Sequence, residues 1–194
     1  MFLVAGLSQS TAGPVYAPAP TADGFRVAPS QIPTTDPVPS QVPAGRVVIP
    51  SVGIDQPIQA EALTPDATGS MVPPTAAAAL VGGTAELSAS EGSSVLAGHV
   101  NTVTNGPGPF ATLASVSAGA VVSTTLPDGS RTDWRVVSAE TLPKDGLPAA
   151  LFDPAGPHQL VLVTCGGPVT GTVPGTNLPS YDYNVVVIAT PIEG

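Results

Sequence analysis

Short apolar runs alternate with turn residues over most of the chain. The runs are rich in Val, Ile, Leu and Ala, and they cover residues 46–49, 54–58, 93–98, 120–126, 131–140, 159–164 and 184–190. Apolar runs of this length, bounded by Gly, Pro, Asn or Asp, predict β-strands. In the last two, the apolar residues follow one another almost without a break, which is typical of strands buried on both faces. The pattern therefore predicts a mainly β fold, a barrel or a sandwich.

Helical segments are few in this pattern. Only residues 75–80, 110–116 and 147–152 suit short helices, and the chain contains 24 Pro and 21 Gly, which disfavours a helical bundle. Residues 127–130 read Pro-Asp-Gly-Ser, a turn sequence that predicts a hairpin between its two flanking runs. Because the strand pattern begins at Arg46, we expect one domain over residues 46–194.

The first 45 residues have a different composition. Residues 1–7 are apolar but too few to span a bilayer, so they are either a ragged tail or the remnant of a longer N-terminal membrane anchor. Residues 8–45 are rich in Pro, Ala, Ser and Thr, which predicts a disordered, semi-rigid spacer. The alternative is a disordered tail with no spacing function.

Charge and cysteine content narrow the possible functions. The chain has 5 Lys and Arg against 14 Asp and Glu, a net charge of −9, which argues against nucleic acid as a partner. Its single cysteine excludes a disulfide framework and a multi-cysteine metal site. The acidic residues show no spacing typical of calcium ligands, and we expect neither a metal nor a cofactor.

The candidate chemistry lies at the ends of two predicted strands. Cys165 follows the apolar run 160–164 and precedes two glycines, and His99 follows the run 93–98. A cysteine beside an imidazolium is a nucleophile, whereas a lone cysteine can also be a small buried apolar residue. His158 lies at the other end of the strand that carries Cys165, roughly 23 Å away, so His99 is the candidate partner.

Five segments frame these two residues. They are RVVIPSVGI (46–54), SVLAGHV (94–100), GPFATL (108–113), LVTCGG (162–167) and YDYNVVVIA (181–189). In this order and combination they resemble the sortase family, and within it the class F type of actinobacteria. The resemblance covers most of residues 46–192.

The resemblance implies a fold, an activity and a location. Sortases fold as a closed β-barrel of about eight strands with short helices. They are membrane-anchored cysteine transpeptidases on the extracellular face of the Gram-positive cell membrane, next to the cell wall. They cleave an LPXTG-like sorting signal of a surface protein between Thr and Gly, and they transfer the acyl group to an amine, usually of a peptidoglycan precursor. On this chain, Cys165 matches the nucleophile, His99 the general acid and base, and Thr164 the residue before the nucleophile. The backbone N–H around Gly166 would help to hold the oxyanion.

One departure from the family pattern concerns the oxyanion. Sortases carry an arginine on the strand after the nucleophile, and the class F pattern places it at position 182, where this chain has Asp182. A carboxylate there would disfavour a thiolate. The candidate substitute donors are Asn184, Tyr181 and Tyr183. Arg131 and Arg135 belong to another strand, where we expect them to face solvent as charges of the hairpin.

Two other functions therefore stay open. One is a catalytically impaired sortase fold that binds peptides. The other is an unrelated cysteine acyltransferase such as an L,D-transpeptidase, although the Ser-His-Gly-Cys cluster of that family is absent. Residues 166–180 are expected to form a loop beside the nucleophile, either selecting the sorting signal or simply connecting two strands.

Overall fold

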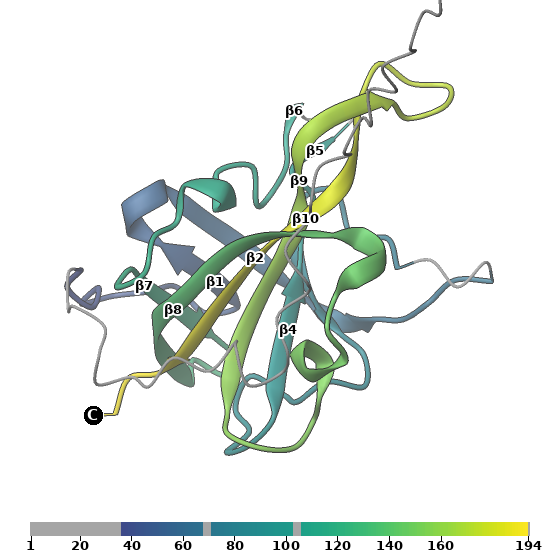
Figure 1. The fold of residues 1–194 in the computed structure, drawn as a ribbon. Coiled ribbons are helices and arrows are strands. Elements are labelled where there is room, and N and C mark those ends of the chain that lie inside the picture. Colours follow the sequence, from purple (N-terminus) through teal and green to yellow (C-terminus); the bar gives the residue numbers. More distant parts are fainter. Residues whose placement is uncertain (1–35, 68–70, 103–105, 194) are drawn as a thin grey trace, which may run out of the picture.

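A computed structural model describes residues 36–67, 71–102 and 106–193. It contains a closed barrel (Figure 1) whose strands are β1 (Arg46–Ile49), β2 (Ile54–Leu63), β3 (Ala78–Val81), β4 (Ser93–Ala97), β7 (Val121–Thr125), β8 (Arg131–Pro143), β9 (Gln159–Thr172) and β10 (Pro179–Pro191). Two shorter strands, β5 (Asn101–Thr102) and β6 (Gly106–Pro107), pair with each other. The helical elements described are 3₁₀ turns: η3 (Pro50–Val52), η4 (Leu113–Ser115), η5 (Lys144–Gly146) and η6 (Ala149–Phe152). The predicted mainly β, closed eight-stranded barrel with short helices is confirmed.

The order of strands around the barrel is β1-β2-β3-β4-β9-β10-β8-β7. Two neighbouring pairs are parallel, β2 with β3 and β4 with β9, and the other pairs are antiparallel. The parallel pairing of β4 with β9 matters for function, because the carboxyl ends of parallel strands lie at the same rim of a sheet. The sequence places His99 just after one of these strands and Cys165 on the other.

Successive side chains of the central strands point to opposite faces of the sheet, and they form two apolar clusters, one on each face. Leu160 and Leu162 of β9 join Trp134 and Phe110 in the larger cluster, which fills the barrel interior. The intervening Val161 points to the opposite face, as successive side chains of a strand do. On that outer face a second cluster forms beneath η6, so β4, β9 and β10 are apolar on both faces. This explains the nearly unbroken apolar runs in the sequence.

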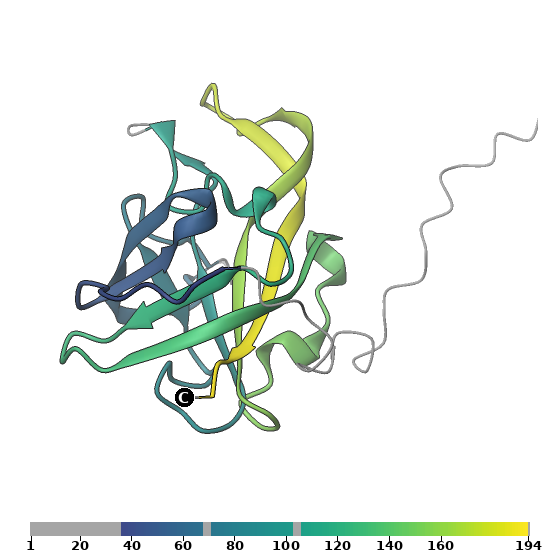
Figure 2. The same ribbon diagram turned by 90° about the vertical axis from the view of Figure 1, so that its left-hand side faces the viewer.

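The β9–β10 hairpin extends well beyond the barrel (Figures 1 and 2). Antiparallel pairing continues from the barrel out to Thr172 and Pro179. The loop expected over residues 166–180 is therefore mostly strand, and only residues 173–178 form the turn. The projecting part is exposed and carries apolar side chains such as Val169, which is 61% exposed. The hairpin forms a wall beside the rim where Cys165 lies.

Three predicted helices differ from the structure. The segment 75–80 was expected to be helical, but Ala78–Val81 is a strand that pairs with β2 and β4. Small apolar residues there are buried between neighbouring strands, and this burial outweighs the helix propensity of alanine. The segments 110–116 and 147–152 shrink to the short 3₁₀ turns η4 and η6.

The residues just before β1 lie along the barrel and form no strand or helix of their own. Arg135 Nη1 donates to the carbonyl of Asp36 at 2.9 Å, and Arg131 Nη2 donates to that of Pro39 at 2.7 Å. Thr125 Oγ1 donates to the carbonyl of Pro43 at 2.5 Å. The two arginines, expected to be solvent-facing charges, instead hold this segment against β7 and β8.

The expected anchor remnant, residues 1–7, and most of the expected spacer, residues 8–45, lie outside the described residues. Within the part of the chain that is described, no helix has both the length and the hydrophobicity needed to cross a bilayer.

Candidate active site

The register of β4 against β9 brings His99 next to Cys165. Ala97 pairs with Val163, and the contact continues through the Gly98 amide, which donates to the Val163 carbonyl at 3.1 Å. Two residues further along each strand are His99 and Cys165. Because side chains alternate, both lie on the outer face of the barrel. Cys165 is a free, half-buried thiol.

The Gly-Pro-Phe segment holds the backbone of His99. The Phe110 amide donates to the His99 carbonyl at 3.0 Å, and the Gly108 amide donates to the Val100 carbonyl at 3.0 Å. A Cβ at Gly108 would lie 2.3 Å from the His99 carbonyl oxygen, so only glycine fits there. The fully buried Phe110 ring packs against Gly98, where a Cβ would lie 2.8 Å from its Cδ2. The motif found in the sequence therefore fixes the position of His99.

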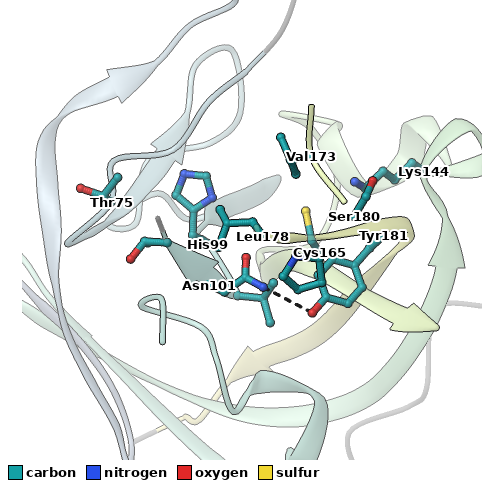
Figure 3. Close-up of a pocket in the computed structure, with 12 residues that line it drawn as sticks. Thr75, His99, Asn101, Lys144, Cys165, Val173, Leu178, Ser180 and Tyr181 are labelled. Carbon is teal, nitrogen blue, oxygen red and sulfur yellow. Dashed lines mark hydrogen bonds between the residues drawn. The ribbon is translucent and has the colours of Figure 1, made fainter. Parts of the chain in front are cut away.

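Two cavities share the Cys165–His99 pair. The first, which we call the hairpin pocket, has a volume of about 260 Å³ (Figure 3). It lies on the side of the β9–β10 hairpin and is lined by His99, Asn101, Lys144, Cys165, Val173, Leu178, Ser180 and Tyr181, among others. The second, the apolar pocket, has a volume of about 340 Å³. Its lining includes Leu63, Met71, Val72, Val81, Val95, Phe152 and Val163. A chain crossing the thiol would thus have a pocket on either side.

Of the predicted oxyanion donors, Asn184 lies nearest in register to the nucleophile. It is directly opposite Cys165 in the β9–β10 ladder, and directly opposite residues share a face. It also lines the apolar pocket. Tyr181 lines the hairpin pocket, where its hydroxyl accepts a hydrogen bond from Asn101 Nδ2 at 3.4 Å (Figure 3). Tyr183 instead covers Gly167, and neither of the two pockets includes it among its lining residues.

Asp182 does not face the thiol. The β9–β10 register shifts between Tyr181 and Tyr183, which leaves Asp182 without a partner residue in the ladder. Its side chain is exposed and lines neither pocket. The expectation that its negative charge would oppose a thiolate at Cys165 is therefore not met by this geometry.

No arginine of the described residues lines either pocket. Arg46 forms an ion pair with Asp55, Arg131 pairs with Asp133 at 2.8 Å, and Arg135 donates to backbone carbonyls. The cation that does line the hairpin pocket is Lys144. Sequence reasoning did not single it out, because nothing in its neighbourhood forms a motif and only the strand order brings it near Cys165.

The residues flanking Cys165 in β9 have structural constraints of their own. Thr164 points inward and is 3% exposed, and its hydroxyl has no hydrogen-bond partner in the described structure. Gly166 is buried, and a Cβ there would lie 2.5 Å from Val185 Cγ2. Gly166 therefore lets β9 and β10 approach closely next to the nucleophile.

His158 lies at the other end of β9, as its spacing predicts. Its Nε2 is 3.0 Å from Ser94 Oγ, and its ring meets the edge of Trp134 with centroids 4.8 Å apart. Burial lowers the pKa of His158 below its ordinary value, an effect partly opposed by a hydrogen bond to the Glu86 backbone. This histidine belongs to the core, and His99 is the histidine at the pockets. Among the described residues, no group of three or more His, Cys, Asp or Glu is placed to hold a metal ion.

Comparison with known proteins matches this domain and its fold to one family. The model of the sortase domain matches residues 47–192. Sortase C2 of Pilus Island 1 from Group B Streptococcus is 21% identical and covers 77% of this chain and 73% of its own, with a TM-score of 0.57. Sortase C-1 from Actinomyces oris is 20% identical, with the same coverages and TM-score. The lid mutant of sortase A from Corynebacterium diphtheriae is 16% identical and covers 80% and 73%, with a TM-score of 0.58. A search of curated protein sequences finds no match.

The chain belongs to the sortase family. Sortases are cysteine transpeptidases that act on sorting signals of surface proteins at the cell surface of Gram-positive bacteria.

Proposed function

We propose that this chain cleaves an LPXTG-like sorting signal between Thr and Gly and transfers the acyl group to an amine, as a class F-like actinobacterial sortase. The observation that carries this proposal is the placement of Cys165 and His99 between two pockets that both residues line. In this assignment Cys165 is the nucleophile and His99 is the general acid and base. Covalent catalysis of this kind divides one acyl transfer into two easier steps.

In the first step, the Cys165 thiolate attacks the Thr carbonyl carbon. A C–S bond forms, the C–N bond to Gly breaks, and His99 gives its proton to the departing amine. In the second step, an acceptor amine attacks the thioester, so that a new C–N bond forms and the C–S bond breaks. His99 takes the proton of the attacking amine, and Cys165 leaves as the thiolate. Water in place of the amine would give hydrolysis.

The two pockets suit the two sides of the cleaved bond. The apolar pocket has exposed apolar side chains at its edge, Met71 at 44% and Val72 at 61% exposure, and it fits the Leu and Pro of a sorting signal. The hairpin pocket carries polar groups from Asn101, Ser180 and Tyr181, and it fits the leaving and the accepting amines. The β9–β10 hairpin then contributes to the choice of the acceptor.

Three groups are candidates for stabilising the oxyanion without the usual arginine. They are the side-chain amide of Asn184, the hydroxyl of Tyr181 and the backbone N–H around Gly166. Asn184 is preferred because it stands opposite Cys165 on the same face. Loss of one preorganised donor typically costs about 10²–10³ in rate, so the identity of this group decides how fast the enzyme works. Thr164 supports the nucleophile from the inner face, and Tyr183 supports the hairpin.

The second candidate function is a peptide-binding module on a catalytically impaired barrel. It is favoured by one observation, that no arginine of the described residues lines the pockets. In that case both pockets would hold a signal peptide without forming an acyl-enzyme.

The setting of the proposed reaction follows from the rest of the chain. Residues 1–7 would be the remnant of a membrane anchor, and residues 8–45 would act as a spacer that holds the domain of residues 46–194 at the extracellular face of the membrane. There the partners would be surface proteins with a sorting signal and an amine of a peptidoglycan precursor. The proposal involves no cofactor and no nucleic acid.

The deciding experiment is intact-mass spectrometry of the full chain with an LPXTG-type peptide, alongside Cys165→Ala and His99→Ala. We expect an acyl adduct on the wild type, none on Cys165→Ala and a much slower one on His99→Ala. Gly171→Ala serves as a control, because its added methyl meets no atom within 4 Å. Peptide binding without any adduct, across several signal variants, would replace the transpeptidase with the binding module.

A further inference from the structure

Lys144 is the one lysine in a chain of net charge −9. It is the only Lys or Arg side chain of the described residues that lines the hairpin pocket, and it does so together with Cys165 and His99. In Figure 3, Lys144 approaches the pocket from beside Ser180, with Cys165 between it and His99. A positive charge at this place attracts an anionic group of whatever occupies the pocket.

The strand register fixes the distance of this charge from the thiol. Leu142 of β8 pairs with Asn184 of β10, and Asn184 pairs with Cys165 of β9, so these three residues lie in one row across the sheet. Lys144 lies two residues beyond Leu142, at the start of η5 where β8 has just ended. With ordinary strand spacing and rise, its Cα is about 12 Å from that of Cys165. The flexible four-carbon side chain of lysine spans part of this gap. Its ammonium therefore meets a group about one residue away from the reacting bond.

The neighbouring carboxylates leave this charge available to a ligand. Asp145 follows Lys144 in sequence, and Asp182 is its nearest acidic neighbour on β10 if the ladder is continued by one residue. Both are exposed, and neither lines the pocket. Of the two ion pairs found among the described residues, neither includes Lys144.

We propose that Lys144 binds a carboxylate on the amine acceptor, and so selects acceptors that carry a negative charge about one residue away from the reacting nitrogen. This inference rests on the proposed transpeptidase function. The acceptor is the relevant substrate because the acyl part of the signal takes the apolar pocket, on the other side of Cys165. The bound carboxylate offsets the repulsion between the lysine and the incoming amine.

The test compares two acceptors that differ only in this charge, the dipeptide Gly-Gly and its C-terminal amide. The acyl-enzyme is formed with a signal peptide, and the rate of its resolution by each acceptor is measured for wild type, Lys144→Gln, Lys144→Arg and Asp145→Asn. For each variant we take the ratio of the rate with Gly-Gly to the rate with its amide, and we compare this ratio between variants. The difference in intrinsic reactivity between the two amines is the same in every ratio, so it cancels. Asp145→Asn is the matched control, since it changes an adjacent exposed charge outside the pocket.

We expect the wild type to favour Gly-Gly over its amide by about two- to five-fold, the size typical of an exposed charge pair. Lys144→Gln abolishes this preference, Lys144→Arg keeps it, and Asp145→Asn leaves it in place. The preference shrinks at high salt, because exposed charges are screened. Acyl-enzyme formation changes less in Lys144→Gln than this preference does.

Two results would overturn the proposal. One is an equal preference in wild type and Lys144→Gln. The other is an equal slowing of acylation and resolution in Lys144→Gln, which would make Lys144 a general electrostatic aid to Cys165. If the wild type forms no acyl-enzyme, the transpeptidase function fails, and NMR titration decides about Lys144 separately. In that titration, Cys165→Ala must bind Gly-Gly more tightly than it binds the amide, and this difference must disappear when Lys144 is also replaced by Gln. If either result fails, the carboxylate site is rejected as well.

Discussion

Gly98 lies between the buried Phe110 ring and the candidate catalytic residue His99, and its substitution by alanine tests the packing in the structure. The new methyl would lie 2.8 Å from Cδ2, 3.0 Å from Cγ and 3.2 Å from Cε2 of Phe110. These are inner atoms of a fully buried ring, so the ring has no exposed end that can swing away. Either the ring or the backbone that leads into His99 must shift.

The expected cost follows from two opposing effects. Overpacking a well-filled core typically costs about 1–3 kcal/mol. Replacing glycine by alanine restricts the unfolded chain, which returns about 0.4–1 kcal/mol. The net loss of unfolding free energy is then about 1–2 kcal/mol. For a domain of this size, 1 kcal/mol shifts Tm by about 2–4 °C, so we expect Gly98→Ala to melt about 2–8 °C lower.

The assay is a double-mutant cycle with Phe110→Leu, followed by thermal and urea unfolding. Leucine lacks Cε2, and its branched Cδ methyl groups can rotate away from the new methyl as a rigid ring cannot, so the double variant should lose at least about 0.5 kcal/mol less than the sum of the single variants. Turnover of a signal peptide should fall in Gly98→Ala and recover partly in the double variant, because His99 returns toward its place. Gly171→Ala, whose methyl meets open space, is the control. A melting temperature equal to the wild type, or strictly additive losses, would refute the packing argument.

Three further outcomes are expected elsewhere in the molecule. Burial lowers the pKa of His158 in the folded state below its value of about 6.5 in the unfolded chain. The neutral ring therefore contributes its full stability above pH about 6.5, and this contribution is lost as the pH falls through the lower pKa of the folded state. In urea unfolding over that acid range, a His158→Gln variant should lose stability less steeply than the wild type. Arg135→Ala should speed amide hydrogen exchange in the segment before β1, which loses a backbone hydrogen bond, and unchanged exchange would show that the arginine does not hold it. Asn184→Arg should speed acyl-enzyme formation at Cys165 more than Asp182→Arg does, and the reverse order would show that residue 182 is the better place for a cation.

The sequence was a good guide to the barrel where apolar runs were long. The runs ending at Thr164 and Thr190 correspond to parts of β9 and β10, because a strand buried on both faces leaves a long stretch of Val, Leu and Ile. The run ending at Ile49 corresponds to β1, in which half-buried and buried residues alternate. The sequence failed at β3, where Ala78, Ala79 and Leu80 have helical propensity but are buried between two strands. It also missed the length of the β9–β10 hairpin, since Gly, Pro and Thr outside the barrel carry no apolar alternation to mark a strand.

The candidate site was predictable to the extent that it depends on strand ends. Cys165 and His99 lie close together because the parallel pairing of β4 with β9 ends at Ala97 and Val163, where β4 stops while β9 runs on to Thr172. The apolar run of β9 in the sequence ends at Thr164, so the sequence still predicts that the two residues lie together. The position of Lys144 could not be predicted, because it depends on the order of strands in the sheet and not on a strand end. Lys144 enters the pocket from the start of η5, directly after β8, which is separated from β9 by β10, and no spacing in the sequence reports a neighbour two strands away.

The candidate oxyanion donor shows how register shifts beside the nucleophile can mislead an assignment made from sequence position alone. A motif aligns residue 182 with the family's arginine, and the alternation of a regular strand would place residues 182 and 184 on the same face. In this structure the register shifts between Ser180 and Tyr181 and again between Tyr181 and Tyr183, each time with an extra residue on β9. Asp182 has no paired residue, is exposed and lines neither pocket, whereas Asn184 remains opposite Cys165. Bulges are common next to active sites. A donor for the thioester carbonyl must approach from the face of Cys165, and on β10 residue 184 lies on that face. The charge at position 182 is therefore a weaker argument against catalysis than the sequence alone indicates.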